Sequence, residues 1–191
     1  MVHYTGINHL ALVTGDMDAT IAFWRDLLGL PLVAGLGHPG YRHYFFALSE
    51  HDMIAFFEWP GVRKLPPKDH GVPVKGPVGF DHVSMAVAAD DDLWALKDKL
   101  EAADFWVSEV IDHGFIHSIY CFDPNEIPIE FSAPVAEVDL RKAPQMTDTA
   151  PSALAREGSA PVPGRWPAVP KPTPEEDRWV FPGEGAIFRD K

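Results

Sequence analysis

The pattern of apolar and polar positions over residues 1–136 occurs twice, in the same order. In each copy a run of alternating side chains, typical of a strand, precedes apolar positions spaced as on a helix, and three more strand-like runs follow. Each copy opens on an apolar residue, an amide or acid, and a histidine, as in Ile7-Asn8-His9 and Phe80-Asp81-His82. The sequence therefore predicts two tandem βαβββ modules of the α+β class.

Turn and capping residues give the expected bounds of these elements. In the first module we expect strands at residues 6–14, 30–34, 41–48 and 53–59, a helix that Asp16 caps and Gly29 ends, and a glycine-rich turn at 35–40. In the second module we expect strands at 78–87, 105–110, 117–122 and 127–132, a helix that begins at Asp90-Asp91-Asp92, and a turn at Asp123-Pro124-Asn125.

The domain organisation follows from these elements and from a change of composition. The first module covers residues 1–62, a linker covers 63–77, and the second module covers 78–136. Residues 137–191 form a C-terminal extension whose frequent prolines exclude regular helix or central strand over most of its length. Aromatic residues near its end are costly to leave in water, so we expect the segment 162–191 to pack on the module surface or on a partner subunit.

Charge and cysteine content narrow the function classes. A formal net charge of −12 at pH 7 argues against nucleic-acid binding and against adhesion to anionic membranes. The single cysteine, Cys121, excludes an intrachain disulfide framework. No apolar run is long enough to span a membrane, and the first residues lack the features of a signal peptide, so a cytoplasmic location is expected.

Candidate metal-ligating residues occur at corresponding sequence positions in the two modules. Glu130 follows His82 by 48 residues, and Glu58 follows His9 by 49 residues. An acid flanked by apolar residues in a strand is costly unless it is paired or ligated. Pairing of the modules would bring these side chains together, so the repeat predicts a shared, metal-bearing pocket.

Several stretches then resemble a known family. The two histidine motifs, the run Ala22-Phe23-Trp24-Arg25-Asp26-Leu27-Leu28-Gly29-Leu30 and the run from Ser118 to Phe131 resemble recurring signatures of the vicinal oxygen chelate superfamily, which includes glyoxalase I, epimerases, bleomycin-resistance proteins and extradiol dioxygenases. The resemblance, over residues 5 to about 133, implies a cupped mixed sheet around a divalent metal, and a homodimer.

The first functional expectation is an extradiol-type dioxygenase that acts on a catechol-like aromatic. By resemblance, His9, His82 and Glu130 would bind Fe(II), and this triad leaves positions open for substrate and dioxygen. Tyr120 and His113 match substrate-side residues of that group, and His51 is the nearest match to its acid–base histidine. His117, four residues after His113, is a further candidate because at least one of the two is expected to reach the site.

Two alternatives remain open from the sequence. In a glyoxalase I-like lyase, isomerase or epimerase, Glu58 would be the fourth ligand of Mn, Zn, Ni or Co and would shuttle a proton on a carbonyl substrate. The other alternative is a metal-free binding or resistance protein. Aromatic residues at strand spacing, among them Phe45, Phe56, Trp106 and Phe115, favour an apolar or aromatic small molecule as the ligand in any of these readings.

Overall fold

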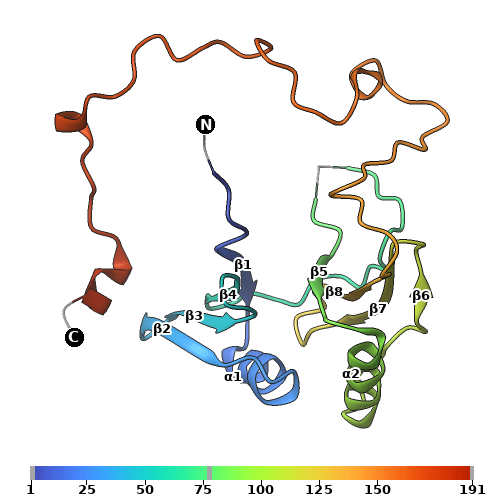
Figure 1. Cartoon of the computed structure of the whole chain (residues 1–191). Coiled ribbons are helices and arrows are strands. Elements are labelled where there is room, and N and C mark those ends of the chain that lie inside the picture. Colours follow the sequence, from blue (N-terminus) through green and yellow to red (C-terminus); the bar gives the residue numbers. More distant parts are fainter. Residues whose placement is uncertain (1–2, 77–78, 190–191) are drawn as a thin grey trace. The chain divides into compact units, whose positions relative to one another are not determined.

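The computed structural model describes residues 3–76 and 79–189 and contains two four-stranded sheets (Figure 1). The strands are β1 (His9–Thr14), β2 (Leu32–His38), β3 (Tyr41–Ala47), β4 (Met53–Glu58), β5 (Val83–Ala86), β6 (Ile111–Asp112), β7 (Ile116–Phe122) and β8 (Pro128–Pro134). The sheet orders are β1-β4-β3-β2 and β5-β8-β7-β6. In each sheet the first and last strands of the module pair in parallel, and the other pairs are antiparallel. The predicted pair of βαβββ modules is confirmed.

The helix of the first module forms where the capping residues predict it. Asp16 caps α1 (Met17–Ile21) by accepting the N–H of Ala19 at 3.0 Å. The helix continues as a π-helical turn over Ala22–Leu27, and Gly29 then takes a φ of +82° that suits a glycine at a helix end. Met17 and Trp24 are fully buried, so this helix carries the apolar side that the sequence indicates.

The predicted turn at residues 35–40 is wrong in its first part, because β2 continues through it to His38. Gly35 and Gly37 lie within the strand opposite Tyr44 and Arg42. A Cβ atom at Gly37 would lie 2.6 Å from the carbonyl oxygen of Tyr41, and one at Gly35 would touch the Tyr44 ring at 3.0 Å. These glycines therefore permit close strand packing rather than a turn.

The second module differs from its prediction at one strand. Residues 105–110, all of them described, form no ladder but only a bridge between Val107 and Cys121, and the two-residue strand β6 follows. The Ser108 hydroxyl accepts the N–H of Tyr120 at 2.9 Å, so a side chain takes the place of a ladder carbonyl. The helix α2 (Asp90–Ala102) begins as predicted. The predicted strand start at Val78 and linker end at Pro77 lie outside the described residues.

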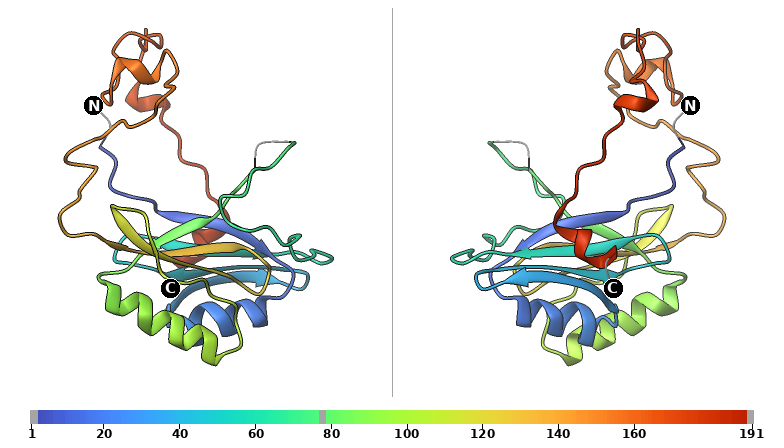
Figure 2. Two further views of the ribbon diagram at one scale, coloured as in Figure 1. Left: turned by 90° about the vertical axis from the view of Figure 1, so that its right-hand side faces the viewer. Right: turned by 90° about the vertical axis from the view of Figure 1, so that its left-hand side faces the viewer.

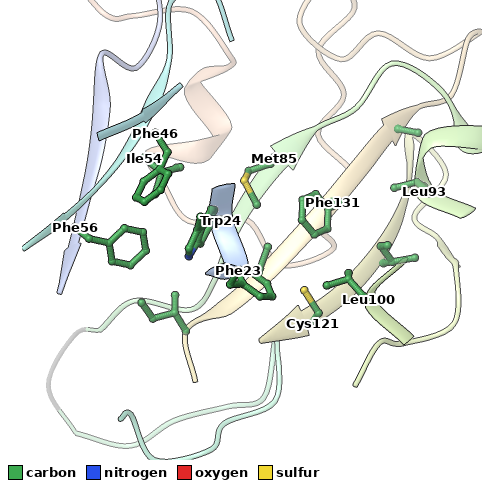
Figure 3. Close-up of a cluster of buried hydrophobic side chains, with 14 of the residues drawn as sticks. Phe23, Trp24, Phe46, Ile54, Phe56, Met85, Leu93, Leu100, Cys121 and Phe131 are labelled. Carbon is green, nitrogen blue, oxygen red and sulfur yellow. The ribbon is translucent and has the colours of Figure 1, made fainter. Parts of the chain in front are cut away.

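One apolar core joins the two modules (Figure 3). Phe23 and Trp24 lie between side chains of the first module and those of the second, such as Met85 and Phe131. The Phe23 ring is 4.8 Å from that of Phe105. Burial of large aromatic side chains supplies most of the stabilisation of such a contact, at about 1.5–3 kcal/mol per side chain.

The C-terminal extension forms a second unit, Val138–Lys191, with little regular structure (Figure 2). Its only regular elements in the described residues are 3-10 turns at Ala155–Glu157, Glu175–Asp177 and Glu184–Arg189. The packing of the segment 162–191 on a module or a partner subunit stays a prediction. In the described part of the chain, no helix has the length and apolar character needed to cross a bilayer.

The turn between β7 and β8 is fixed by one buried carboxylate. Asp123 accepts the backbone N–H groups of Asn125 at 2.8 Å and Ile127 at 2.9 Å, and the Asn125 side-chain amide at 3.0 Å. It also accepts the indole N–H of Trp24 at 3.3 Å, so the same group joins the two modules.

We expect Asp123→Ala to lower the free energy of unfolding by about 2–4 kcal/mol, because it leaves several buried donors without an acceptor. Urea denaturation followed by tryptophan fluorescence measures this change. Asp148→Ala is the matched control, since Asp148 caps an exposed turn through the N–H of Ala150. Equal stability of the two variants would contradict the role of Asp123.

Candidate metal centre

Strand pairing places Glu130 on the same sheet face as His82. Ser84 and Tyr120 are both opposite Glu130 in the ladder, and paired residues project to the same side of a sheet. His82 precedes Ser84 by two residues and so belongs to that face. Alternate residues such as Ile129 point the other way, into the core. The second module thus gathers its polar side chains on one face.

His82 and Glu130 form the centre of this polar face. The Nε2 atom of His82 lies 2.9 Å from Oε2 of Glu130, whose side chain is only 5% exposed. On the other side of the ring, Nδ1 lies 2.6 Å from Oδ1 of Asp81. A histidine between two carboxylates can donate a proton to each, and a metal ion would replace the proton at Nε2. The Asp81 contact leaves Nε2 as the ligating atom.

Tyr120 and His113 extend the hydrogen bonding from Glu130. The Tyr120 hydroxyl donates to Oε1 of Glu130 at 3.2 Å, and His113 Nε2 lies 3.0 Å from the same hydroxyl, so the imidazole is the donor there. Burial and the neighbouring Glu130 charge raise the pKa of Tyr120 to about 12. Burial opposes the ionised form of Glu130, but hydrogen bonds from Ser118, Ser84 and Tyr120 outweigh it and lower the carboxyl pKa. Tyr120 therefore stays a neutral donor to an ionised Glu130.

The linker adds a histidine that the sequence did not point out. The ring of His70 lies 5.8 Å from that of His82 and 4.6 Å from that of Tyr120, between centroids, and its Nε2 donates to the Ile129 carbonyl at 3.1 Å. Burial, together with the nearby His82, lowers the pKa of His70. A histidine in a Pro/Gly/Lys-rich segment has no periodicity that would have predicted this position.

Asp81 holds that linker segment in place. Its carboxylate accepts Lys68 Nζ at 2.7 Å and the N–H of Gly71 at 3.1 Å in addition to the His82 contact. The Lys68 ammonium, His82 and the Gly71 N–H keep the pKa of Asp81 well below its usual range. The acid that precedes the histidine motif thus orients His82 and positions His70 at once.

His9 has the same local arrangement but different neighbours. Its Nδ1 atom lies 2.8 Å from Oδ1 of Asn8, as that of His82 does from Asp81, so Nε2 is again the atom left for a metal. Its ring packs edge-on against Phe45 at 5.6 Å. Within residues 3–76 and 79–189, no three histidine, cysteine or carboxylate side chains lie together as a metal-binding group. The expected meeting of His9 with His82 and Glu130 is therefore not present in the isolated chain.

Glu58 does not occupy the place in its module that Glu130 has in the second. In the ladder between β1 and β4, His9 is opposite Met53 and Ala11 is opposite Ala55. Ala55 therefore corresponds to Glu130, and Glu58 lies three residues further along, on the other face. There its carboxylate accepts the N–H of Met17 at 2.8 Å and pairs with Arg42 at 3.2 Å. The near-equal spacing from histidine to acid in the two modules did not indicate equivalent positions.

The two remaining histidine candidates lie away from the His82–Glu130 pair. His117 is opposite Ala133, on the face toward α2, and its Nδ1 lies 2.9 Å from Asp90 at the start of that helix. His51 is exposed in the turn between β3 and β4, where it lines a hollow of about 530 Å³ with Asn8 and Met53. His117 is thus outside the site, whereas His51 lies near the residue that precedes His9.

The donor set fits a divalent first-row metal. Such ions bind imidazole nitrogens and carboxylate oxygens, which His9, His82 and Glu130 offer. Each of these side chains also has a partner that orients it: Asn8 for His9, Asp81 for His82 and Tyr120 for Glu130.

Comparison with known proteins identifies the superfamily of this chain. The family model described as Glyoxalase/Bleomycin resistance protein/Dioxygenase superfamily matches residues 6–131. The chain belongs to this superfamily, whose fold is the vicinal oxygen chelate fold. A comparison with curated proteins gave no match.

Solved structures with the same fold include a superfamily domain, a lyase and a resistance protein. A glyoxylase/bleomycin resistance protein/dioxygenase domain from Frankia sp. has a TM-score of 0.59 at 20% identity, over 70% of this chain and 100% of its own. Lactoylglutathione lyase from Agrobacterium tumefaciens has a TM-score of 0.51 at 27% identity, over 68% and 94%. The fosfomycin resistance protein FosX of Listeria monocytogenes, solved with Mn(II) and sulfate, has a TM-score of 0.52 at 17% identity, over 71% and 97%.

We expect Glu130→Gln to weaken Mn(II) binding by at least about 100-fold and Glu58→Gln to change it less than about twofold, because only Glu130 shares a face with His82. Mn(II) titration followed by electron paramagnetic resonance of the free ion measures both. A large loss of binding in Glu58→Gln would contradict the observed register and would restore the four-ligand site.

Proposed function

We propose that the chain is a metal-dependent dioxygenase that opens the ring of a catechol-like aromatic by extradiol cleavage, with Fe(II) as its metal and dioxygen as second substrate. The observation that carries the proposal is the ligand count: His9, His82 and Glu130 are available, and Ala55 stands where a fourth carboxylate would be. A metal with two histidines and one carboxylate supplies Lewis acidity and open adjacent positions on which a vicinal diol can chelate.

The residues around the triad have roles that follow from their contacts. Tyr120 and His113 form a chain of hydrogen bonds that ends on Glu130, so they hold the carboxylate in place. His70 lies against Tyr120 and covers one side of the pair, where it limits access of water. His51 stays the candidate base, because it lies in the first module near Asn8, the residue before His9.

The alternative isomerase or lyase chemistry receives less support. The chain is 27% identical to a lactoylglutathione lyase over 68% of its length. That chemistry, in the form expected from the sequence, uses Glu58 as ligand and proton shuttle. Glu58 instead binds the N-terminus of α1 and Arg42 on the opposite sheet face, away from the face that bears His9.

The third ligand is proposed to come from a second copy of the chain, in a homodimer. Within one chain the two modules share a core on the helix side, through Trp24 and Phe23, and the two histidines contact different residues. A twofold dimer in which the first module of one chain faces the second module of the other would bring His9 to the His82–Glu130 pair and would form two identical sites.

Dioxygenase activity is tested with protein loaded with Fe(II) in the absence of air. We expect catechol and oxygenated buffer to give a yellow ring-fission product, with one dioxygen consumed for each catechol, because both oxygen atoms enter the product. Glu130→Gln should abolish the reaction, and Glu58→Gln should retain most of it.

Two other results would overturn the assignment. Proton exchange on a carbonyl substrate supported by Zn, Ni or Co, without oxygen uptake, would identify the isomerase class. A protein that retains no divalent metal but binds small aromatics would identify the binding or resistance class.

Mixing of inactive variants tests the second-copy ligand. His9→Ala and His82→Ala chains, dissociated and reassociated in equal amounts, should recover about a quarter of wild-type activity, because half of the dimers would then hold one intact site. His82→Ala mixed with Glu130→Gln is the matched control and should recover none, since both changes lie in the second module. Recovery in neither mixture would show that the ligands come from a single chain.

A further inference from the structure

We propose that residues 68–71 of the linker form a latch that closes over the His82–Glu130 pair, with Lys68 as its positioning residue, so that metal binding and latch closure favour each other. The proposal rests on the proposed function only in taking His82 and Glu130 as ligands of a divalent metal. It does not depend on the reaction that the metal supports. The observation that carries it is that one carboxylate, that of Asp81, holds both the latch and His82.

Asp81 divides its two oxygen atoms between the latch and the candidate ligand. Oδ2 accepts Lys68 Nζ at 2.7 Å, while Oδ1 accepts the Gly71 N–H at 3.1 Å and lies 2.6 Å from His82 Nδ1. An exposed ion pair by itself adds little stability, but here the ammonium group fixes the rotation of the carboxylate. Because Oδ2 is occupied, Oδ1 stays directed at His82, whose Nε2 atom lies 2.9 Å from Glu130.

The backbone of the latch has the conformation that this contact needs. Gly71 has a φ of +65°, in the left-handed region that glycine adopts readily, and its N–H is donated to Asp81. A Cβ atom at Gly71 would meet nothing within 4 Å, so the φ angle and not a lack of space favours glycine there. Ahead of the latch, the N–H of Leu65 donates to the Asn125 carbonyl at 2.9 Å. The segment 65–71 is therefore attached to the second module at both ends.

The closed latch places His70 against the metal centre. The His70 ring lies 4.6 Å from that of Tyr120 and 5.8 Å from that of His82, between centroids. Its Nε2 atom donates to the Ile129 carbonyl at 3.1 Å, which fixes the ring on the strand that carries the acidic ligand. Opening of the latch would withdraw this ring and would release the carboxylate that orients the histidine ligand.

The shared carboxylate makes the coupling reciprocal. Ligation at Nε2 would fix the His82 ring, and the hydrogen bond at Nδ1 would then hold Asp81 where the latch contacts it. A closed latch holds Asp81 in that same place and so lowers the cost of ordering His82 for a metal. By linkage, each event favours the other by the same factor. In the first module the neutral Asn8 is the partner of His9 and offers no charge to a lysine, so the latch is a feature of the second module.

Mn(II) titration of the full-length protein, followed by electron paramagnetic resonance of the free ion, tests the role of Lys68. Lys68→Met should weaken binding about 3- to 10-fold, less than the loss of a direct partner of a ligand, because Lys68 acts through Asp81. Lys68→Arg, which keeps the ion pair, should restore most of the affinity. Loss of a positive charge by itself would strengthen the binding of a cation, so the sign of the change separates positioning from electrostatics. Lys75→Met is the matched control, because Lys75 is an exposed lysine of the same linker, and it should bind Mn(II) at least as tightly as the wild type.

Hydrogen exchange measures closure of the latch itself, without substrate. In the metal-free protein, Lys68→Met should speed the exchange of the peptide that contains the Gly71 amide, and Lys75→Met should leave it unchanged. Mn(II) should slow this exchange in the wild type, because a fixed His82 holds Asp81 against the latch. Mass spectrometry of the digested protein after exchange gives these rates.

The outcomes distinguish failure of the latch from failure of the metal centre. Unchanged or tighter Mn(II) binding in Lys68→Met, or exchange at Gly71 that Mn(II) does not slow, would overturn the latch. If Glu130→Gln alone loses Mn(II), the metal centre stands and the latch is wrong. If Glu130→Gln also retains Mn(II), the metal centre is wrong and the latch falls with it.

Discussion

The parallel pairing of the first and last strands in each module is the constraint on which the site depends. Side chains on a strand alternate between faces, so the pairing register decides which face an acid joins. In the second module the register places Glu130 beside His82. In the first module the same pairing offers Ala55 at that place, and the acid three residues later emerges on the helix side. The proposed ligand set of two histidines and one carboxylate rests on this difference.

The two modules use one repeated scaffold for two kinds of surface. On the second, hydroxyl groups of Ser84 and Tyr120 and the ionised Glu130 surround His82. On the first, aromatic rings extend from His9 across three strands. The two modules thus share one backbone fold but carry different side chains on the equivalent sheet face.

The position of the core explains why the sheet faces that bear His9 and His82 are not used to join the modules within one chain. Phe23 and Trp24 fill the space between the modules on the helix side, and Asp123 ties the last hairpin to Trp24 by a hydrogen bond. Each sheet buries one face in this core, so its other face stays available. A chain that unites its modules through their helices can complete a shared metal centre by presenting those faces to a second copy.

The sequence by itself determined the local features of this protein: the two βαβββ repeats, the Asp16 cap, the turn at Asp123, and the group of His82, Glu130, Tyr120 and His113. The repeats, the cap and the turn follow from periodicity and from residues that act on near neighbours, and the pair of His82 and Glu130 follows from the repeated spacing. Tyr120 and His113 were expected from the resemblance to a known family. Tertiary structure alone decided that Glu58 and His117 face the helices and that His70 reaches the site from the linker. Residue spacing counts positions along the chain, whereas the face and the neighbours of a side chain depend on turn lengths, strand register and the path of a linker without periodicity.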